Sequence, residues 1–244
     1  MCLKSSRCCN IILQKITDQA CYIYCKMKIH LTRFLYTCGI VAPPVIILII
    51  IISGLLTPGY NPLVDSISTL SDQNSLTPGL MTTGFIVFGS LMICFSIGLY
   101  LGLERSGKSV IIGIAFALYG IGMIFTGVFR DSPAVAGTII NAEGIMHNVA
   151  TVIAFFSLLA GMLVFVKNVH KIPSWYGLTW FTLIASAIGL LLSVIFIIAS
   201  HVTYSGLIQR VFYIIPMIWI ELVSIWLFRL SFESGKVGID NDNN

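Results

Sequence analysis

Six long runs of apolar residues, almost free of charge, constrain this 244-residue chain more than any other feature. They occupy about residues 34–56, 81–103, 109–129, 145–166, 176–200 and 207–228. Each run is close to the roughly 20 residues that a helix needs to cross the core of a bilayer. Only 10% of the residues are charged, whereas a soluble domain carries roughly a quarter. The sequence therefore predicts an all-α membrane protein with six transmembrane helices in one bundle.

The lysine and arginine residues predict the orientation of this bundle, because positive charge collects on the cytosolic side of a membrane. A cytosolic amino terminus places 12 of the 14 lysine and arginine residues inside and leaves only Arg130 and Arg210 outside. We therefore expect a multi-pass protein of the cell membrane with both termini cytosolic. The predicted parts are a basic tail at 1–33, a transmembrane domain at 34–230 and a polar tail at 231–244. The net charge of +4 then reflects topology, and no nucleic-acid partner is expected.

The loop after the first run predicts a short amphipathic helix on the outer surface. Asn61 followed by Pro62 is typical of a helix N-cap with proline at the first helical position. Leu63, Ile67 and Leu70 then recur at spacings of four and three residues, which gives one apolar face.

The polar residues of note fall in three outer segments. Arg130 and Asp131 follow Gly127 on the small-residue face of the third helix, so both are expected to face neighbouring helices. His147 heads a similar face on the fourth helix. His201 and Arg210 flank the last outer loop, and Glu221 lies within the sixth helix. Because charge is costly inside a membrane, Glu221 is expected to face the bundle interior.

Two interpretations of the outer arginines stay open. Arg130 and Arg210 could make structural ion pairs with carboxylates of the outer segments, of which Asp65 is one. They could instead clamp an anionic headgroup or phosphate, since arginine binds such groups through paired hydrogen bonds. In the second case the candidate ligand-binding residues are Arg130, Arg210, Asp65, His201 and Glu221.

Four motifs in this order resemble the bacterial and archaeal membrane proteins of domain-of-unknown-function family 998. They are Ile67-Ser68-Thr69-Leu70, the third helix ending in Asp131, the pair His147-Asn148, and the segment Gly206 to Arg210. The resemblance extends over about residues 34–230. It implies a six-helix integral membrane fold and brings no established activity.

Three functions compete on the sequence alone. A protein that binds a lipid headgroup or small anion at an outward-facing Asp/His/Arg site is the first, and membrane lipids are its expected partners. A membrane-embedded hydrolase is the second, with Asp131, His147 and Ser68 as candidate catalytic residues, because a serine nucleophile needs a histidine base and a carboxylate. Asp131, His147 and His201 could alternatively hold zinc. No cofactor is expected. A structural or accessory protein is the third.

Overall fold

The computed structural model describes residues 3–72, 75–103, 107–132, 134–135, 138–139, 141–198 and 204–240. Its long helices are α1 (Leu3–Leu56), α2 (Pro78–Gly102), α3 (Gly107–Val128), α4 (Ala142–Val169), α5 (Tyr176–Ile198) and α6 (Ser205–Asp240). Two 3-10 helices, η1 (Ser68–Ser71) and η2 (Pro173–Trp175), lie between them, as does an antiparallel pair, β1 (Ala134–Val135) and β2 (Thr138–Ile139). All six long helices are apolar enough to cross a membrane. The predicted six-helix membrane fold is therefore confirmed.

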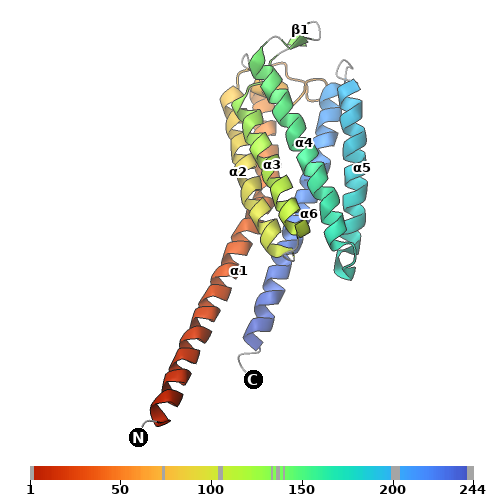
Figure 1. Ribbon diagram of the computed structural model, residues 1–244. Coiled ribbons are helices and arrows are strands. Elements are labelled where there is room, and N and C mark those ends of the chain that lie inside the picture. Colours follow the sequence, from red (N-terminus) through yellow and green to blue (C-terminus); the bar gives the residue numbers. More distant parts are fainter. Residues whose placement is uncertain are drawn as a thin grey trace.

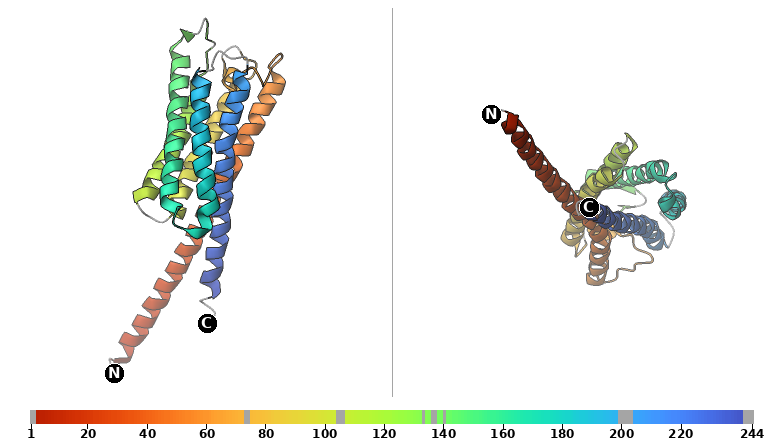
Figure 2. Two further views of the ribbon diagram at one scale, coloured as in Figure 1. Left: turned by 90° about the vertical axis from the view of Figure 1, so that its right-hand side faces the viewer. Right: turned by 90° about the horizontal axis from the view of Figure 1, so that it is seen from below.

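The six helices are arranged as a ring. Each packs against its neighbours in the sequence, and α6 returns to pack against α1 (Figure 2). Both chain termini lie at one end of the bundle, which we call the terminal end, and α1 extends beyond the other helices there (Figure 1). The α1–α2 loop, the β1–β2 pair and the start of α6 lie at the opposite end, which we call the loop end. Which end faces the cytosol stays a prediction from the charges.

Small residues hold α2, α3 and α4 close together. A Cβ atom on Gly89 of α2 would lie 2.4 Å from the Gly120 carbonyl oxygen of α3, and one on Gly120 would lie 2.6 Å from the Gly89 oxygen. Between α3 and α4, a Cβ on Gly122 would lie 2.7 Å from the Ala154 Cβ. Glycine allows such backbone contact in membranes, where helix packing depends on van der Waals contact.

Trp219 joins the second half of the ring to the first. Its fully buried indole on α6 stacks on Phe116 of α3 at 5.3 Å and meets the Phe165 ring of α4 edge-on at 5.3 Å. Its Nε1–H donates to Thr182 Oγ1 of α5 at 2.7 Å. One side chain thus connects four helices, with its only polar atom satisfied, as a buried indole requires.

The predicted amphipathic outer helix is shorter in the structure than expected. Asn61 does begin a turn, since its side chain accepts from the Leu63 N–H at 3.0 Å and its carbonyl accepts from the Asp65 N–H at 2.7 Å. The turn then stops, and only η1 follows. Ser66 explains the break, because its hydroxyl accepts from the Thr69 N–H at 3.3 Å, and such local bonds compete with a continuous helix.

Candidate functional site

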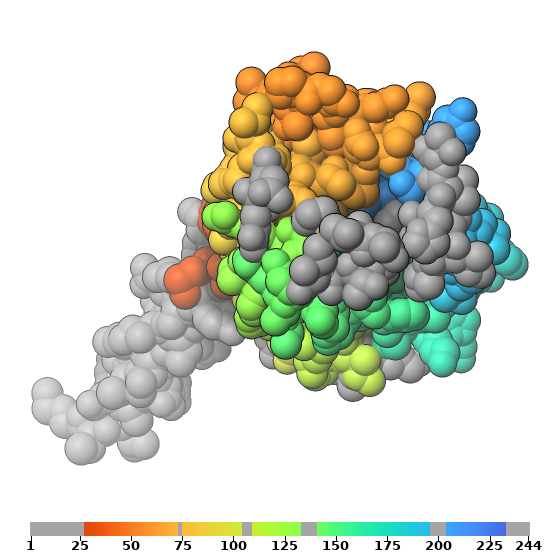
Figure 3. Space-filling model, turned by 90° about the horizontal axis from the view of Figure 1, so that it is seen from above, coloured from red at the N-terminus to blue at the C-terminus, as the bar shows by residue number. Residues whose placement is uncertain are grey.

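The α1–α2 loop is fastened to the start of α6 by a set of contacts that we call the loop lock, formed by residues 60–68 with 205–210. Two backbone bonds begin it, from Gly206 N–H to the Val64 carbonyl at 3.1 Å and from Leu207 N–H to the Leu63 carbonyl at 3.0 Å. These are free N–H groups of the first turn of α6, which otherwise have no partner in the helix. Seen from the loop end, the loop forms one side of the molecule and reaches the start of α6 (Figure 3).

Gly206 is required by the closeness of this contact. A Cβ at this position would lie 2.3 Å from the Asp65 carbonyl oxygen and 2.9 Å from the Pro62 carbonyl oxygen. No side chain fits there without moving the loop backbone away from α6. The glycine of the Gly206–Arg210 motif therefore sets the distance between loop and helix.

Arg210 directs its guanidinium at backbone oxygens of the loop. Its Nη1 donates to the carbonyls of Pro62, Asp65 (3.0 Å) and its own helix at Gly206 (3.0 Å). Its Nη2 donates to the Tyr60 hydroxyl, which in turn donates to the Ser66 carbonyl at 3.1 Å. Burial raises the pKa of Tyr60, while the nearby Arg210 acts in the opposite direction. Arg210 thus binds the backbone carbonyl of Asp65. An ion pair with the Asp65 carboxylate was one of the predicted alternatives.

Gln209 completes the loop lock from a buried position. Its Oε1 accepts from the Ile67 N–H at 2.5 Å, and its Nε2 donates to the Ser68 hydroxyl at 3.3 Å. Ser68, a candidate nucleophile, therefore bonds to an amide of α6. Within the described residues, no hydrogen bond connects Ser68 to His147.

His147 lies in a second place at the loop end, between α3 and α4. Its side chain is 1% exposed, and its Nδ1 lies 2.9 Å from the Thr126 carbonyl oxygen and 2.8 Å from the Phe129 carbonyl oxygen. Both partners are acceptors, so Nδ1 must carry the proton. In the neutral imidazole Nε2 is then an acceptor. The histidine closes the end of α3 by satisfying carbonyls that the helix leaves free.

Asp131 is the electrostatic neighbour of His147, and we call the two the Asp131–His147 site. The Asp131 carboxylate is half-buried and accepts from the Ser132 N–H at 2.9 Å. Burial raises the pKa of Asp131 above its ordinary value, while His147 and the Ser132 N–H act in the opposite direction. Asp72 of the α1–α2 loop raises it further by like-charge repulsion. The Asp131 carboxylate is therefore the centre of this part of the loop end, with His147 and Asp72 as its electrostatic neighbours.

Arg130 differs from its prediction. The residue was expected on a face packed against other helices, but its side chain is exposed. Its backbone N–H donates to Glu143 Oε1 at 3.1 Å. The reason for the difference is that α3 ends at Val128, so the helical spacing no longer applies two residues later.

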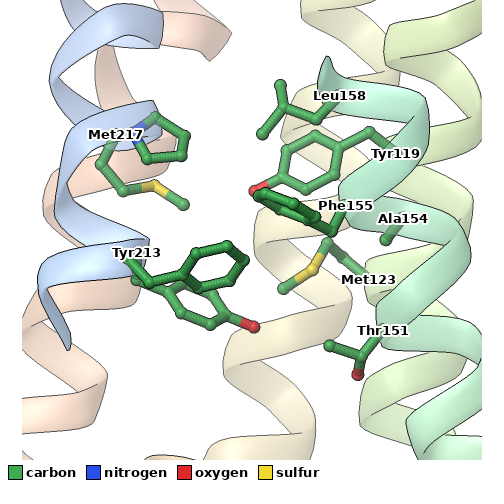
Figure 4. Close-up of a pocket in the computed structure, with 10 residues that line it drawn as sticks. Tyr119, Met123, Thr151, Ala154, Phe155, Leu158, Tyr213 and Met217 are labelled. Carbon is green, nitrogen blue, oxygen red and sulfur yellow. The ribbon is translucent and has the colours of Figure 1, made fainter. Parts of the chain in front are cut away.

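A small cavity lies deeper in the bundle, below the Asp131–His147 site. It has a volume of about 20 Å³, which is space for one water molecule. Thr151 of α4 lines the cavity. Its hydroxyl donates to the His147 carbonyl at 2.9 Å and bonds to the Thr126 hydroxyl at 3.1 Å, both toward the loop end. The Tyr119 and Tyr213 hydroxyls point into the space (Figure 4). Polar groups thus continue from His147 toward the centre of the bundle.

Glu221 also differs from its prediction. Met217 and Ser224 on the same expected face are buried, but Glu221 is only half-buried. It lies on the flank of α6 beside the exposed Ile218 and Leu222. Helical spacing does not predict this outcome, because Glu221 lies at the border between the packed and the exposed faces of α6.

Helix α5 carries a stripe of Thr and Ser residues whose hydroxyls bond within their own helix. Thr182 Oγ1 donates to the Leu178 carbonyl at 2.6 Å, and Ser186 Oγ donates to the Thr182 carbonyl at 2.8 Å. The hydroxyls of Thr179 and Ser193 do the same. The stripe therefore serves packing against α4 and α6.

The metal hypothesis has a limited outcome. Within the described residues, no group of three His, Cys, Asp or Glu side chains is placed to hold a metal ion. His201, which the zinc hypothesis needs, falls outside those residues. A zinc site with Asp131 and His147 thus stays a prediction.

Sequence reasoning did not identify Tyr60, Gln209 and Thr151 as parts of these sites. Gln209 had a signal, because it belongs to the Gly206–Arg210 motif. Tyr60 had none, because its partners depend on the path of the loop. Thr151 lies on the small-residue face that begins at His147, but helical spacing alone does not predict its bond to Thr126.

The four motifs that carry the family resemblance form two pairs at the loop end, one in the loop lock and one in the Asp131–His147 site. Ile67 and Ser68 bond to Gln209 in the loop lock, and Asp131 is the electrostatic neighbour of His147. A family model described as "Protein of unknown function (DUF998)" matches residues 40–226 of the chain. No curated protein and no solved structure matches it.

Proposed function

The chain belongs to the DUF998 family, and on that premise we propose that this multi-pass membrane protein is a binding protein whose ligand carries a positive charge. The ligand site is the Asp131–His147 site. The observation that carries the proposal is the half-buried Asp131 carboxylate, whose pKa burial raises. Asp72 of the α1–α2 loop adds negative charge near it. A ligand that donates hydrogen bonds and carries positive charge complements such a site.

An ammonium group has this chemistry. It offers up to three N–H donors and one positive charge. It can come from a free amine or from a lipid headgroup such as that of phosphatidylethanolamine. The half-buried position of Asp131 strengthens the attraction, because charges interact more strongly where water is partly excluded.

An anion is disfavoured by how the two arginines are used. The Arg210 guanidinium already donates to three carbonyls and the Tyr60 hydroxyl. The Arg130 side chain is exposed rather than held toward the site. The proposal therefore replaces the anionic headgroup predicted from the sequence with a cationic one.

Hydrolysis is the weaker candidate. A serine triad needs its nucleophile within hydrogen-bonding reach of the histidine, and Ser68 is instead bonded to Gln209. The zinc alternative stays a prediction, because His201 lies outside the described residues.

The distribution of lysine and arginine favours a position of this site on the outer side of the cell membrane, with both termini in the cytosol. The ligand would then enter from outside. A single cysteine introduced at Arg130 tests this orientation, in a chain whose native cysteines have been replaced. It should react with a membrane-impermeant maleimide in intact cells. Labelling only after the cells are opened would contradict it.

The binding proposal is tested on the purified full-length chain by calorimetry with ethanolamine hydrochloride and, separately, sodium phosphate. We expect ethanolamine to bind and Asp131→Asn to weaken its affinity about tenfold or more. Asp65→Asn is the matched control, because the Asp65 carboxylate accepts from the Asn61 N–H at 2.7 Å within the loop lock. The same calorimetry after reconstitution in phosphatidylethanolamine and in phosphatidylglycerol vesicles distinguishes a lipid headgroup from a free amine as the ligand. Phosphate binding without ethanolamine binding would overturn the proposal.

A further inference from the structure

We propose that Glu221 of α6 and backbone carbonyls of α1 form a site for a monovalent metal cation within the membrane. The inference does not depend on the Asp131–His147 site. It starts from one buried polar atom, Glu221 Oε2, which has no hydrogen-bond partner. In a membrane helix such an atom is costly and indicates a missing partner.

Glu221 is the acid that lies deep in a membrane span. The six spans contain two acidic residues, Glu143 in the first turn of α4 and Glu221 in α6. Glu221 is the seventeenth residue of the 28-residue span Ser205–Phe232, so it lies near the middle of the membrane. Simple solvation at a membrane surface therefore does not account for its charge.

The neighbouring helix α1 offers oxygen atoms at two consecutive prolines. Pro43 and Pro44 lie inside α1 without ending it. Proline has no N–H, so the carbonyls four residues earlier, on Gly39 and Ile40, lose their usual helix donors. Freed carbonyls inside membrane helices are tolerated where another group satisfies them.

The contact between Gly39 and Ser224 places these groups at the same depth. A Cβ on Gly39 would lie 2.2 Å from Ser224 Oγ, so α1 and α6 touch there. The two helices run in opposite directions (Figure 1). Pro43 on α1 and Glu221 on α6 therefore both lie on the loop-end side of this contact, each within about one helical turn of it.

The chemistry of these groups selects the class of ligand. A carboxylate and backbone carbonyls are oxygen ligands, which hard metal ions prefer. Broken or proline-interrupted membrane helices coordinate Na⁺ in this way. A single carboxylate balances one positive charge, so a monovalent ion leaves the site neutral in the membrane interior.

The test is thermal unfolding of the purified full-length chain in detergent, with NaCl or KCl exchanged for N-methyl-D-glucamine chloride at constant ionic strength. We expect Tm to rise with Na⁺ or K⁺ by about 3–5 °C for each tenfold increase beyond the dissociation constant. Equilibrium binding of radioactive sodium should give one ion for each chain if Na⁺ is the preferred ion. Glu221→Gln should remove the rise in Tm, whereas Glu143→Gln, the other acid of the spans, should retain it.

A second variant keeps the proposal open to contradiction if Glu221→Gln does not fold. Replacing both Pro43 and Pro44 by alanine restores the helix donors and should weaken cation binding about tenfold or more. A wild-type Tm that does not respond to Na⁺ or K⁺ would overturn the proposal. So would a Tm that responds only to pH, because Glu221 would then hold a proton alone, and so would a Glu221→Gln chain with unchanged cation dependence.

Discussion

The loop lock and the Asp131–His147 site lie at the same end of the bundle, and each is built from two sequence motifs with charged residues. In the loop lock the charge belongs to Arg210, and its donors are taken up by the carbonyls of Pro62, Asp65 and Gly206 and by the Tyr60 hydroxyl. In the Asp131–His147 site the charge belongs to a half-buried carboxylate with a raised pKa, beside the buried His147 imidazole.

The difference shows that charge at a helix end does not by itself identify a functional site. A guanidinium whose donors all meet backbone oxygens fixes a loop in place, and a ligand would have to displace those bonds. A carboxylate that burial makes harder to ionise can gain from a cationic partner. The following changes separate a place that holds the fold from one that is free to bind.

The largest effect is expected from Gly206→Ala. Its Cβ would overlap the Asp65 carbonyl oxygen, at 2.3 Å, so the loop must leave α6. We expect a loss of about 3 kcal/mol in the free energy of unfolding, measured by denaturant titration in detergent. The control is Gly79→Ala at the loop end of α2, where a Cβ would meet nothing within 4 Å. Equal losses in both variants would mean that the loop lock is not a tight contact.

Arg210→Ala should cost about 2 kcal/mol, because bonds from a charged donor to loop carbonyls are lost together. Arg130→Ala removes the other loop-end arginine, whose side chain is exposed, and should change stability by less than about 0.5 kcal/mol. Limited proteolysis of residues 57–77 gives a second measurement, with faster cleavage expected only for the Arg210 variant. Similar behaviour of the two variants would contradict the distinction between them.

His147→Leu should lower stability by about 1 kcal/mol, since the carbonyls of Thr126 and Phe129 lose their shared donor. His147→Asn tests the cause, because its side-chain amide can place a donor near the position of Nδ1. Partial recovery in the asparagine variant, measured by thermal unfolding, is the expected result. If leucine and asparagine were equivalent, the Nδ1 bonds would not be the stabilising contact.

The effect of Asp131→Asn should appear as a change in the pH dependence of stability. Burial raises the pKa of Asp131 in the folded chain, so folding favours its protonated form. Its contribution to stability is therefore complete below the unfolded-state pKa and is lost as the pH rises through the folded-state pKa. Unfolding curves of wild type and variant between pH 4 and pH 8 should differ in this slope. Parallel curves would show that Asp131 is not strained by burial.

The six spans could be predicted from the sequence because a membrane leaves a helix few alternatives. Backbone groups must be satisfied within each segment, so length and hydropathy were enough to locate the helices. The two short strands at residues 134–139 carried no comparable signal, since a pair of two-residue strands is too short for a periodic pattern.

The arrangement around the site was less predictable, and three residues show why. Arg130 was expected to be packed, but the helix that would position it ends two residues earlier. Arg210 was expected to meet a carboxylate or a ligand, but its partners are carbonyls whose positions depend on the path of the loop. Asp65 bonds back to the Asn61 N–H, a local contact that no hydrophobic pattern reports.

The Tyr60–Arg210 bond joins positions 150 residues apart in the chain, which has a consequence for biosynthesis. At roughly 5–20 residues per second, α6 emerges from the ribosome on the order of ten seconds after the α1–α2 loop. During that interval the loop has no lock, and the interface of α1 that receives α6 is uncovered. A chain stalled before Gly206 would carry both features permanently.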